Sequence, residues 1–246
     1  MESVMSNYYI ELTPSQFRAR LAAAPIAYLP LGTLEWHSEH LPLGTDGIIS
    51  GGFFDALASR VGGIVLPMLF LGPDRVREDG LIGMDFCSFP KDDPAFYTDR
   101  QLDGSAYWIP DDLYVAIIRA TFAQLARAGF KIVVAHGHGP SGHLYSESIP
   151  RWEAEFGLRC FTCVDSSPGA LGVQTDHAAV NETSLVMALR PELVDMSALS
   201  TDPSEFPVGV WGDDPRGAAT AEIGVRAIAV QVDRMEKILK GALAEL

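Results

Sequence analysis

Short apolar runs alternate along the chain with longer stretches that repeat apolar residues at helical spacing. Four runs have the length and composition of buried parallel strands: Ile26–Leu31, Ile64–Phe70, Lys131–Ala135 and Leu158–Val164. Three longer stretches place apolar residues three and four apart, as one buried helix face requires: Asp46–Val61, Asp111–Ala128 and about Ala221–Leu246. This alternation predicts an α/β fold, with a mostly parallel sheet covered on both sides by helices.

One long segment, Leu71–Trp108, interrupts this alternation. It is rich in Asp, Gly and Pro and shows no sustained period. A loop of this length in a compact domain is usually a lid, a binding loop or an interface arm, although a solvated surface excursion is the other interpretation. Its aromatic residues, among them Phe96 and Trp108, favour a pocket or a subunit contact.

Composition and charge narrow the class of protein. The 246 residues are 48% hydrophobic, and no linker divides them, so we expect residues 1–246 to form a single domain with a well-filled core. A net charge of −14 argues against nucleic acid as a partner. The N-terminus lacks the features of a signal peptide, and the longest apolar run, Gly62–Gly72, is too short to span a bilayer. These features predict a cytoplasmic protein without a membrane partner.

A C-x-x-C pair, Cys160 and Cys163, lies within the last predicted strand. Residues three apart in a strand point to opposite faces, so the two thiols should diverge. A redox pair would normally open a helix, where the thiolate is stabilised. We therefore expect both cysteines to be structural.

All six histidines fall in three short segments, whereas structural histidines would be scattered. The first segment contains His37 and His40, the second contains His136, His138 and His143, and the third contains His177. This clustering predicts a functional site.

The first segment begins where a predicted strand ends, the edge at which open α/β sheets bind ligands. Glu35 and His37 are two residues apart, so they project to the same side of an extended chain. Asp46 follows at the start of a predicted helix. Together these residues form a mixed oxygen and nitrogen set that suits Zn, Mn or Fe. Taken singly, Asp46 would cap the helix and Glu35 would be a surface charge.

The other two segments have similar alternatives. His138 lies between Gly137 and Gly139, which allow a tight bend after a predicted strand, although a plain turn would carry the same glycines. In the third segment Asp176 precedes His177, and a carboxylate beside a histidine is the usual material of a proton shuttle. The other interpretation is that Asp176 caps the helix that follows.

These segments together resemble the creatininase family, also called creatinine amidohydrolases. The family carries E-x-H followed by H-L-P-L-x-x-D, then G-H-G after a strand, then H-A followed by E-T-S. The matching stretches are Glu35–His37, His40–Asp46, Gly137–Gly139, His177–Ala178 and Glu182–Ser184, with a looser match over Gly212–Gly224. The resemblance runs from about Pro25 to Gly224, with Leu71–Asp103 as a weakly matched insert.

The resemblance implies a three-layer α/β/α fold, often assembled into homo-hexamers, and two divalent metal ions bridged by Asp46. Glu35 and His138 would hold one ion together with Asp46, and His37 would hold the other. His177 corresponds to the proton-transfer histidine and Asp176 to a neighbouring acid. With Glu182 of the E-T-S element, these two form the candidate catalytic residues.

Two departures from the family pattern affect the expected substrate and the second ion. The glutamate of creatininase proper, two residues after the G-H histidine, is replaced by Pro140, and one substrate-enclosing tryptophan is replaced by Val173. Creatinine is therefore not the expected substrate. The second ion would need Glu182, His136, His143 or water as a replacement ligand.

The expected function is hydrolysis of a C–N bond in a small non-peptide amide, with a cyclic amide or a formamide as candidates. A metal-bound hydroxide would attack the carbonyl, and His177 would protonate the leaving nitrogen. Two alternatives stay open: a lactone or peptide-end hydrolase on the same scaffold, and a non-catalytic metal- or ligand-binding protein, which Pro140 motivates.

Overall fold

A four-stranded parallel sheet forms the centre of the computed structural model, which describes residues 5–76, 78, 80, 82–86, 107–165 and 171–246. The strands lie in the order β2 (Ile64–Val65), β1 (Ile26–Leu31), β3 (Ile132–Gly137) and β4 (Arg159–Thr162). Every neighbouring pair is parallel, and β1 pairs with β3 over its whole length, from Ile26 opposite Ile132 to Leu31 opposite Gly137.

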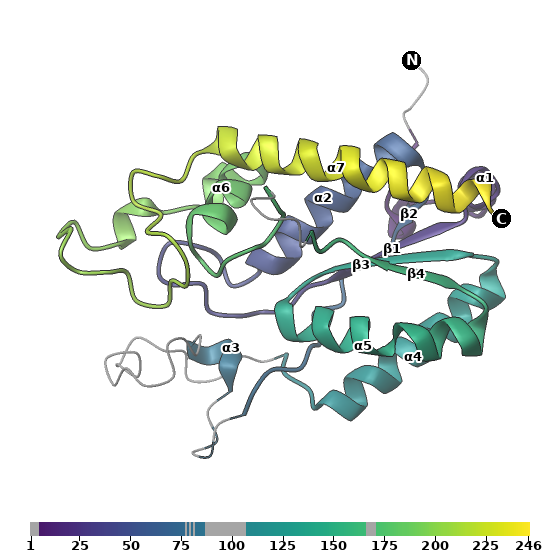
Figure 1. Cartoon of the computed structure of the whole chain (residues 1–246), viewed down its shortest axis with the longest axis horizontal. Helices are drawn as coiled ribbons and strands as arrows, with labels where there is room; N and C mark the ends of the chain where they lie inside the picture. Colours follow the sequence, from purple (N-terminus) through teal and green to yellow (C-terminus); the bar gives the residue numbers. More distant parts are fainter. Residues whose placement is uncertain (1–4, 77, 79, 81, 87–106, 166–170) are drawn as a thin grey trace.

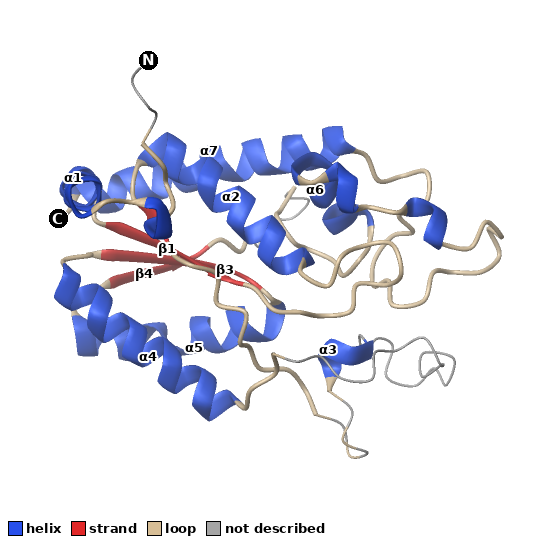
Figure 2. Ribbon diagram, turned by 180° about the vertical axis from the view of Figure 1, so that it is seen from behind, coloured by secondary structure: helices blue, strands red, loops and turns tan. Residues whose placement is uncertain are grey.

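Helices cover both faces of this sheet (Figure 1; Figure 2). On one face α2 (Thr45–Val61), α6 (Val180–Leu189) and α7 (Ala221–Ala244) pack together, and on the other α4 (Asp111–Ala128) packs beside α5 (Gly139–Phe156). The remaining helices are α1 (Pro14–Ala23), α3 (Gly83–Phe86) and the 3₁₀ turns Tyr9–Glu11, Pro191–Leu193 and Met196–Ala198. The three-layer α/β/α prediction is confirmed. Among the described residues, no helix is both long and apolar enough to cross a bilayer.

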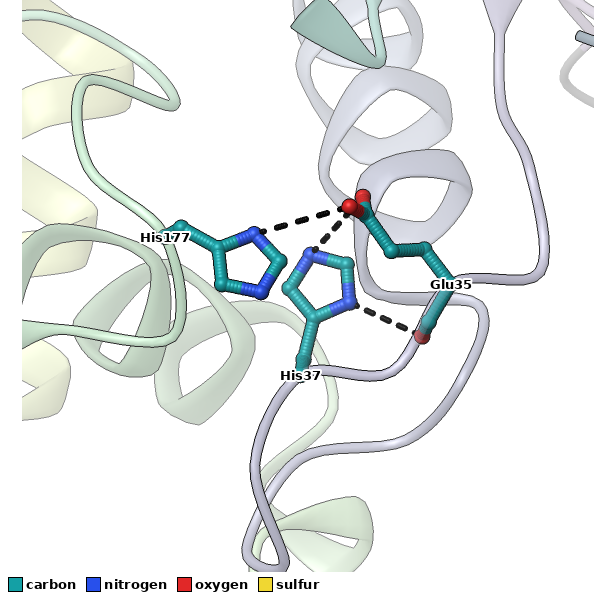
Figure 3. A group of neighbouring side chains, drawn as sticks. All are labelled: Glu35, His37 and His177. Carbon is teal, nitrogen blue, oxygen red and sulfur yellow. Dashed lines mark hydrogen bonds and ion pairs between the residues drawn. The ribbon is translucent and has the colours of Figure 1, made fainter. Parts of the chain in front are cut away.

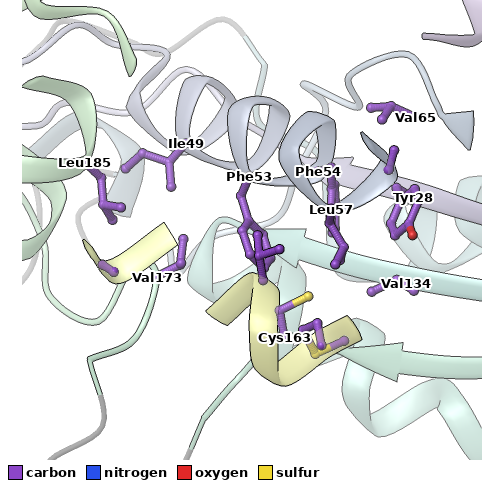
Figure 4. Close-up of a cluster of buried hydrophobic side chains, with 14 of the residues drawn as sticks. Tyr28, Ile49, Phe53, Phe54, Leu57, Val65, Val134, Cys163, Val173 and Leu185 are labelled. Carbon is purple, nitrogen blue, oxygen red and sulfur yellow. The ribbon is translucent and has the colours of Figure 1, made fainter. Parts of the chain in front are cut away.

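Two hydrophobic cores, one on each side of the sheet, hold the layers together. Successive residues of β1 alternate between them. Tyr28 packs with Phe53 and Phe54 of α2 (Figure 4), whereas Leu29 packs in the core of α4 and α5. Because both faces of the strand are buried, its sequence is apolar throughout, as expected for a covered parallel sheet.

The predicted elements agree closely with the observed ones, with one clear exception. The helix over Asp111–Ala128 has the predicted bounds, and Gly129 ends it in a left-handed conformation. The exception is β2, which stops at Val65 instead of continuing to Phe70. Pro67 has no N–H to donate to the ladder, so beyond this point only single bonds to β1 remain, such as Leu69 N–H to the Pro30 carbonyl at 3.1 Å.

The two cysteines diverge as predicted. Cys160 belongs to the core beneath α4 and α5, whereas Cys163 belongs to the core beneath α2 and α7 (Figure 4). Both are buried free thiols. Burial raises the pKa of each to about 12, so neither has the thiolate character of a redox cysteine.

The carboxyl ends of β1 and β3 meet at the centre of one sheet edge. The backbone N–H of His138 donates to the Leu31 carbonyl at 2.8 Å, which ties the end of β3 to the end of β1. Gly137 has φ 146°, and a Cβ at this position would lie 1.7 Å from the Leu31 carbonyl oxygen, so only glycine fits this approach. Histidine-bearing loops therefore leave two adjacent strands side by side.

The ends of the segment 71–108 are paired with each other. Gly72 N–H donates to the Tyr107 carbonyl at 3.2 Å, and Ile109 N–H donates to the Gly72 carbonyl at 3.0 Å. The described part of this segment includes α3 and reaches the site described below. The aromatic residues Phe96 and Tyr97, on which its predicted role partly rests, lie outside the described residues.

Candidate metal centre

The loop between β1 and α2 carries the first set of predicted ligands. Its backbone is fixed by bonds from Glu35 N–H to the Leu43 carbonyl at 2.9 Å and from Trp36 N–H to the Met84 carbonyl at 2.8 Å. Glu35, His37 and Asp46 are all buried. The extended stretch at residues 35–37 and the first turn of α2 thus direct three polar side chains into the interior.

Three groups of ligand-type atoms lie within 4.8 Å of one another in the described part of the chain. Glu35, Asp46 and His138 form one, which we call the strand-end group. His37, Asp46 and Glu182 form a second, the helix-end group. The third, Glu35, His37 and His177, is drawn in Figure 3, where both imidazoles face the Glu35 carboxylate. Asp46 belongs to both of the first two groups, which is the position that a bridging carboxylate needs.

The spacing of these atoms fits a cation better than it fits hydrogen bonds. His37 Nε2 lies 3.5 Å from Asp46 Oδ1 and 3.5 Å from Glu182 Oε2. Two ligands bound at about 2.1 Å to one tetrahedral ion are about 3.4 Å apart. Among the described residues, His37 Nε2 and Asp46 Oδ2 are buried and have no hydrogen-bond partner. Buried polar atoms normally have partners, so these two indicate that a ligand belongs here.

Three histidines share one hydrogen-bonding arrangement. His37 Nδ1 is 3.0 Å from the Glu35 carbonyl, His138 Nε2 is 3.1 Å from the Pro73 carbonyl, and His177 Nε2 is 3.0 Å from the Trp36 carbonyl. A carbonyl can only accept, so in each ring the bonded nitrogen carries the hydrogen. In the neutral ring the other nitrogen then offers its lone pair to the carboxylate cluster. This is the usual outer-shell support of a metal-ligating histidine.

The strand-end group is the more compact of the two. His138 Nδ1 lies 3.1 Å from Glu35 Oε2 and 3.3 Å from Asp46 Oδ2, and all three side chains are buried. Its ligands come from the ends of two adjacent strands and the first turn of α2. The four predicted metal ligands, Glu35, His37, Asp46 and His138, are therefore brought together by the fold.

The cluster attracts positive charge. Burial lowers the pKa of His37, but the carboxylates of Asp46, Glu182 and Glu35 outweigh it and raise the pKa to about 10. Burial likewise lowers the pKa of His138, yet Glu35 and Asp46 raise it well above its usual range. Conversely, the two histidines hold the pKa of Asp46 below its usual value although burial raises it. Protons or cations can supply this charge, and the paired acids with neutral imidazoles suit divalent cations.

Glu182 was predicted as a catalytic residue, and the structure places it beside His37 and Asp46. It lies in the first turn of α6, is buried, and its Oε2 accepts from Ala178 N–H at 2.7 Å. Burial and the nearby Asp46 and Asp176 raise its pKa well above its usual range. Among the replacement ligands considered from the sequence, Glu182 is the residue that the structure places in a group with His37 and Asp46. His136 and His143 belong to none of the three groups.

The other histidines have structural partners. His136 contacts Ser50 Oγ at 3.1 Å and the Val173 carbonyl at 3.2 Å, and burial lowers its pKa to about 4. His143 is exposed on α5 and pairs with Glu147 at 3.3 Å. His40 lies 2.9 Å from Thr183 Oγ1. His136 and His40 are thus buried with partners inside the fold, whereas His143 is exposed and lines the cavity described next.

Asp176 does not hold His177. Its two carboxylate oxygens accept from Asn181 N–H at 2.7 Å and from Glu182 N–H at 3.1 Å, so it satisfies the first turn of α6. This is the capping alternative considered from the sequence. The ring of His177 is instead positioned by the Trp36 carbonyl and by stacking on His37, with ring centroids 4.3 Å apart. Burial and the neighbouring His37 lower the pKa of His177 to about 4.

A cavity of about 590 Å³ opens onto the cluster. Its lining includes residues of the cluster, namely Glu35, Asp46, His138, His177 and Glu182. It also includes part of the segment 71–108, namely Pro73, Asp74, Arg75 and Gly83. The segment therefore contributes to the pocket, as its length and aromatic content suggested.

Asp74 and Gln174 are two of the cavity residues that lie outside every sequence motif. Asp74 Oδ2 lies 3.9 Å from His138 Nε2, and burial together with Glu35 raises the pKa of Asp74 to about 6. Gln174 contacts Asp46 from a loop 128 residues away. Neither position belongs to a periodic element, so no spacing signal could have located them.

A buried cluster of carboxylates and histidines at the carboxyl edge of a parallel sheet, open to a small cavity, defines a metal-dependent enzyme of the α/β class. The family model described as creatininase, creatinine amidohydrolase, matches residues 10–84 and 100–239. The chain belongs to this family and is therefore a creatininase-like amidohydrolase. The segment that the match omits falls within the predicted insert.

Named relatives agree with this assignment. A creatinine amidohydrolase of Pseudomonas putida is 27% identical over an alignment of 219 residues, and the match covers 80% of this chain and 77% of the relative. A crystal structure of creatininase has a TM-score of 0.73 at 22% identity, covering 98% of this chain and 99% of the other. A structure named as a manganese form of creatininase has a TM-score of 0.71 at 22% identity, covering 97% and 99%. These two structures share the fold of this chain.

Proposed function

We propose that the protein hydrolyses a C–N bond of a small non-peptide amide with two divalent cations. The strand-end group, Glu35, Asp46 and His138, would hold one ion, and the helix-end group, His37, Asp46 and Glu182, would hold the other. The observation that carries the proposal is the place of Asp46 in both groups, with its Oδ2 and the adjacent His37 Nε2 buried and without a hydrogen-bond partner among the described residues. The donor set suits Zn, Mn or Fe.

When bound, the two cations would lower the pKa of a water molecule and polarise the substrate carbonyl. The chain's own residues supply orientation and proton transfer. His177 lines the cavity, its Nε2 is fixed by the Trp36 carbonyl, and its Nδ1 lies 3.9 Å from Glu35 Oε1. We assign to its Nδ1, which carries the lone pair in this tautomer, the transfer of a proton from the attacking water to the leaving nitrogen.

The shape of the site bears on the substrate. The cavity volume, about 590 Å³, suits a small molecule. Val173 is packed in the core beneath α2 and does not line the cavity, so the aromatic enclosure expected for creatinine is not provided at this position. Creatinine is therefore not the substrate that we propose. A small cyclic amide or a formamide fits the chemistry of the site better.

The direct test is hydrolysis of a panel of cyclic amides, formamides, lactones and short peptides by the manganese- or zinc-loaded protein, with metal content measured on the same sample. We expect turnover of a small amide and close to two ions per chain. Turnover of lactones or peptide ends alone would replace the proposed substrate class. Binding of metal with no hydrolysis of any panel member would favour a binding protein instead.

We also propose that the protein works in the cytoplasm as a homo-oligomer, as hexamers are frequent in the family that its motifs resemble. Light scattering on the purified protein would give the oligomer size directly. A monomer at micromolar concentration would contradict this part of the proposal.

A further inference from the structure

Gln174 reaches the metal centre from a distant part of the chain. It lies in the loop before α6, and its side-chain Nε2 contacts Asp46 Oδ1 on α2, 128 residues away in sequence. It also lines the cavity together with Asp46, His177 and Glu182. No motif of the sequence includes it, and neither group of proposed metal ligands uses it.

The backbone at Gln174 is held in an unfavourable conformation. In the described part of the chain, the non-glycine residues with positive φ are Ser38 at 57°, Gln174 at 61° and Ala178 at 51°. Ser38 follows His37, and Ala178 follows His177, so all three are at the site. Left-handed backbone costs free energy for a residue with a Cβ, and such strain gathers where a side chain must be aimed. At Gln174 it aims an amide at Asp46.

The contact with Asp46 fixes which way the amide faces. A carboxylate oxygen only accepts, so the NH₂ of Gln174 must be the end that faces Asp46. The other end, Oε1, is then held in place. This oxygen is buried and has no hydrogen-bond partner within the described residues. A buried acceptor without a donor is costly, so a donor from a molecule in the cavity would stabilise it.

We propose that Gln174 is a substrate-binding residue whose Oε1 accepts an N–H of the amide substrate. This inference rests on the proposed function and narrows its substrate class to amides that carry an N–H, excluding fully substituted ones. A site built to bind an N–H discriminates against the analogue that lacks it, because the acceptor is then left unpaired. The contact exists before and during the reaction, so its loss raises KM more than it lowers kcat.

The test compares two probes, 2-pyrrolidinone and N-methyl-2-pyrrolidinone, whose lactam rings differ at the N–H. Their affinities are measured by calorimetry on the manganese-loaded wild type and on Gln174→Ala. We expect the wild type to prefer 2-pyrrolidinone about tenfold, as one neutral hydrogen bond allows. In Gln174→Ala the affinity for 2-pyrrolidinone should fall about tenfold, while the affinity for the N-methyl probe stays within about twofold. Gln174→Gly is the matched control, since it also lacks the amide but adopts positive φ freely; it should behave like Gln174→Ala.

Several results would overturn the inference. One is equal affinity of the wild type for the two lactams, and undetectable binding of both counts as equal. Another is a preference for 2-pyrrolidinone that is retained in Gln174→Ala. A loss of manganese from both variants would also overturn it, because Gln174 would then position Asp46 and not the substrate. The binding assay needs no turnover. Discrimination without hydrolysis of any amide would reject the proposed function alone, and hydrolysis without discrimination would reject the role of Gln174 alone.

Discussion

The two halves of the metal centre are held by different kinds of backbone. The strand-end group takes Glu35 and His138 from the ends of two adjacent, hydrogen-bonded strands, so the sheet itself sets their separation. The helix-end group depends on Glu182, which α6 delivers after a long excursion of the chain. The loop before α6 contains two of the strained positive-φ residues, Gln174 and Ala178. The sheet topology therefore fixes the strand-end group, whereas the conformation of the loop before α6 fixes the helix-end group.

This difference predicts which of the two groups binds its ion more tightly. The strand-end ligands lie 3.1 and 3.3 Å from His138 Nδ1, whereas the helix-end ligands lie 3.5 Å from His37 Nε2. A preorganised site loses less free energy in ordering its ligands. The strand-end group should therefore bind its ion more tightly.

Asp46→Ala should have the largest effect because it removes the ligand that both groups share. We expect metal content near zero and no amide hydrolysis, with the fold retained, since the cores do not depend on this side chain. Element analysis of the dialysed variant, with circular dichroism as the fold control, measures this. Full metal content in Asp46→Ala would contradict the shared role.

Glu182→Gln should remove one ion and leave the other. The amide keeps an oxygen that can accept from Ala178 N–H, so the loop stays in place while the charge is lost. His37→Ala should lose the same ion, and His138→Ala should lose the other. Metal titration of the three variants should show that the ion retained in Glu182→Gln is the tighter one. Two ions in Glu182→Gln would mean that Glu182 is not a ligand.

His177→Ala should reduce turnover by about 10²–10⁴-fold while both ions are retained, because its proposed task is proton transfer in the chemical step. His177 belongs to neither the strand-end group nor the helix-end group. Metal content therefore distinguishes a proton-transfer role of His177 from a metal-ligand role. If this variant lost one ion, His177 would be a ligand in the third group, and the proton would have to come from elsewhere in the cavity.

Asp176→Ala should have the smallest effect on chemistry. Its carboxylate accepts from two N–H groups at the start of α6 and makes no contact with the His177 ring, so the loss should fall on stability, by about 1 kcal/mol. Urea unfolding with and without metal would measure it. A fall in turnover as large as that of His177→Ala, with unchanged stability, would favour the other interpretation from the sequence, a proton shuttle formed by Asp176 and His177.

The same contrast explains what could be predicted from the sequence. Glu35, His37, Asp46 and His138 could be located because strands, their ends and the start of a helix have periodic or compositional signals. The exact end of β2 could not be located from the pattern of apolar residues, because Pro67 interrupts the pairing inside a continuous apolar run. The choice between the two interpretations of Asp176 also could not be made from the sequence. Asp176 is next to His177 in the chain, but its carboxylate accepts from the N–H groups five and six positions later.

Two further cavity residues, Gln174 and Asp74, also could not be located from the sequence. Gln174 contacts Asp46 only because the loop before α6 crosses the sheet edge, and Asp74 reaches His138 from within the non-periodic segment 71–108. Neither contact follows from local propensity or spacing, since both depend on tertiary packing of loops. Tertiary packing likewise brings Glu182 of α6 beside His37 and Asp46, where we propose that it replaces the family glutamate missing at Pro140.

Anomalous diffraction from crystals of the manganese-loaded protein would show directly how many ions the site holds and which residues ligate them. We expect two manganese peaks, one on each side of Asp46. The first should be ligated by Glu35 and His138, and the second by His37 and Glu182. A single peak, or a second ion ligated by His177 with Glu182 turned away, would contradict this expectation.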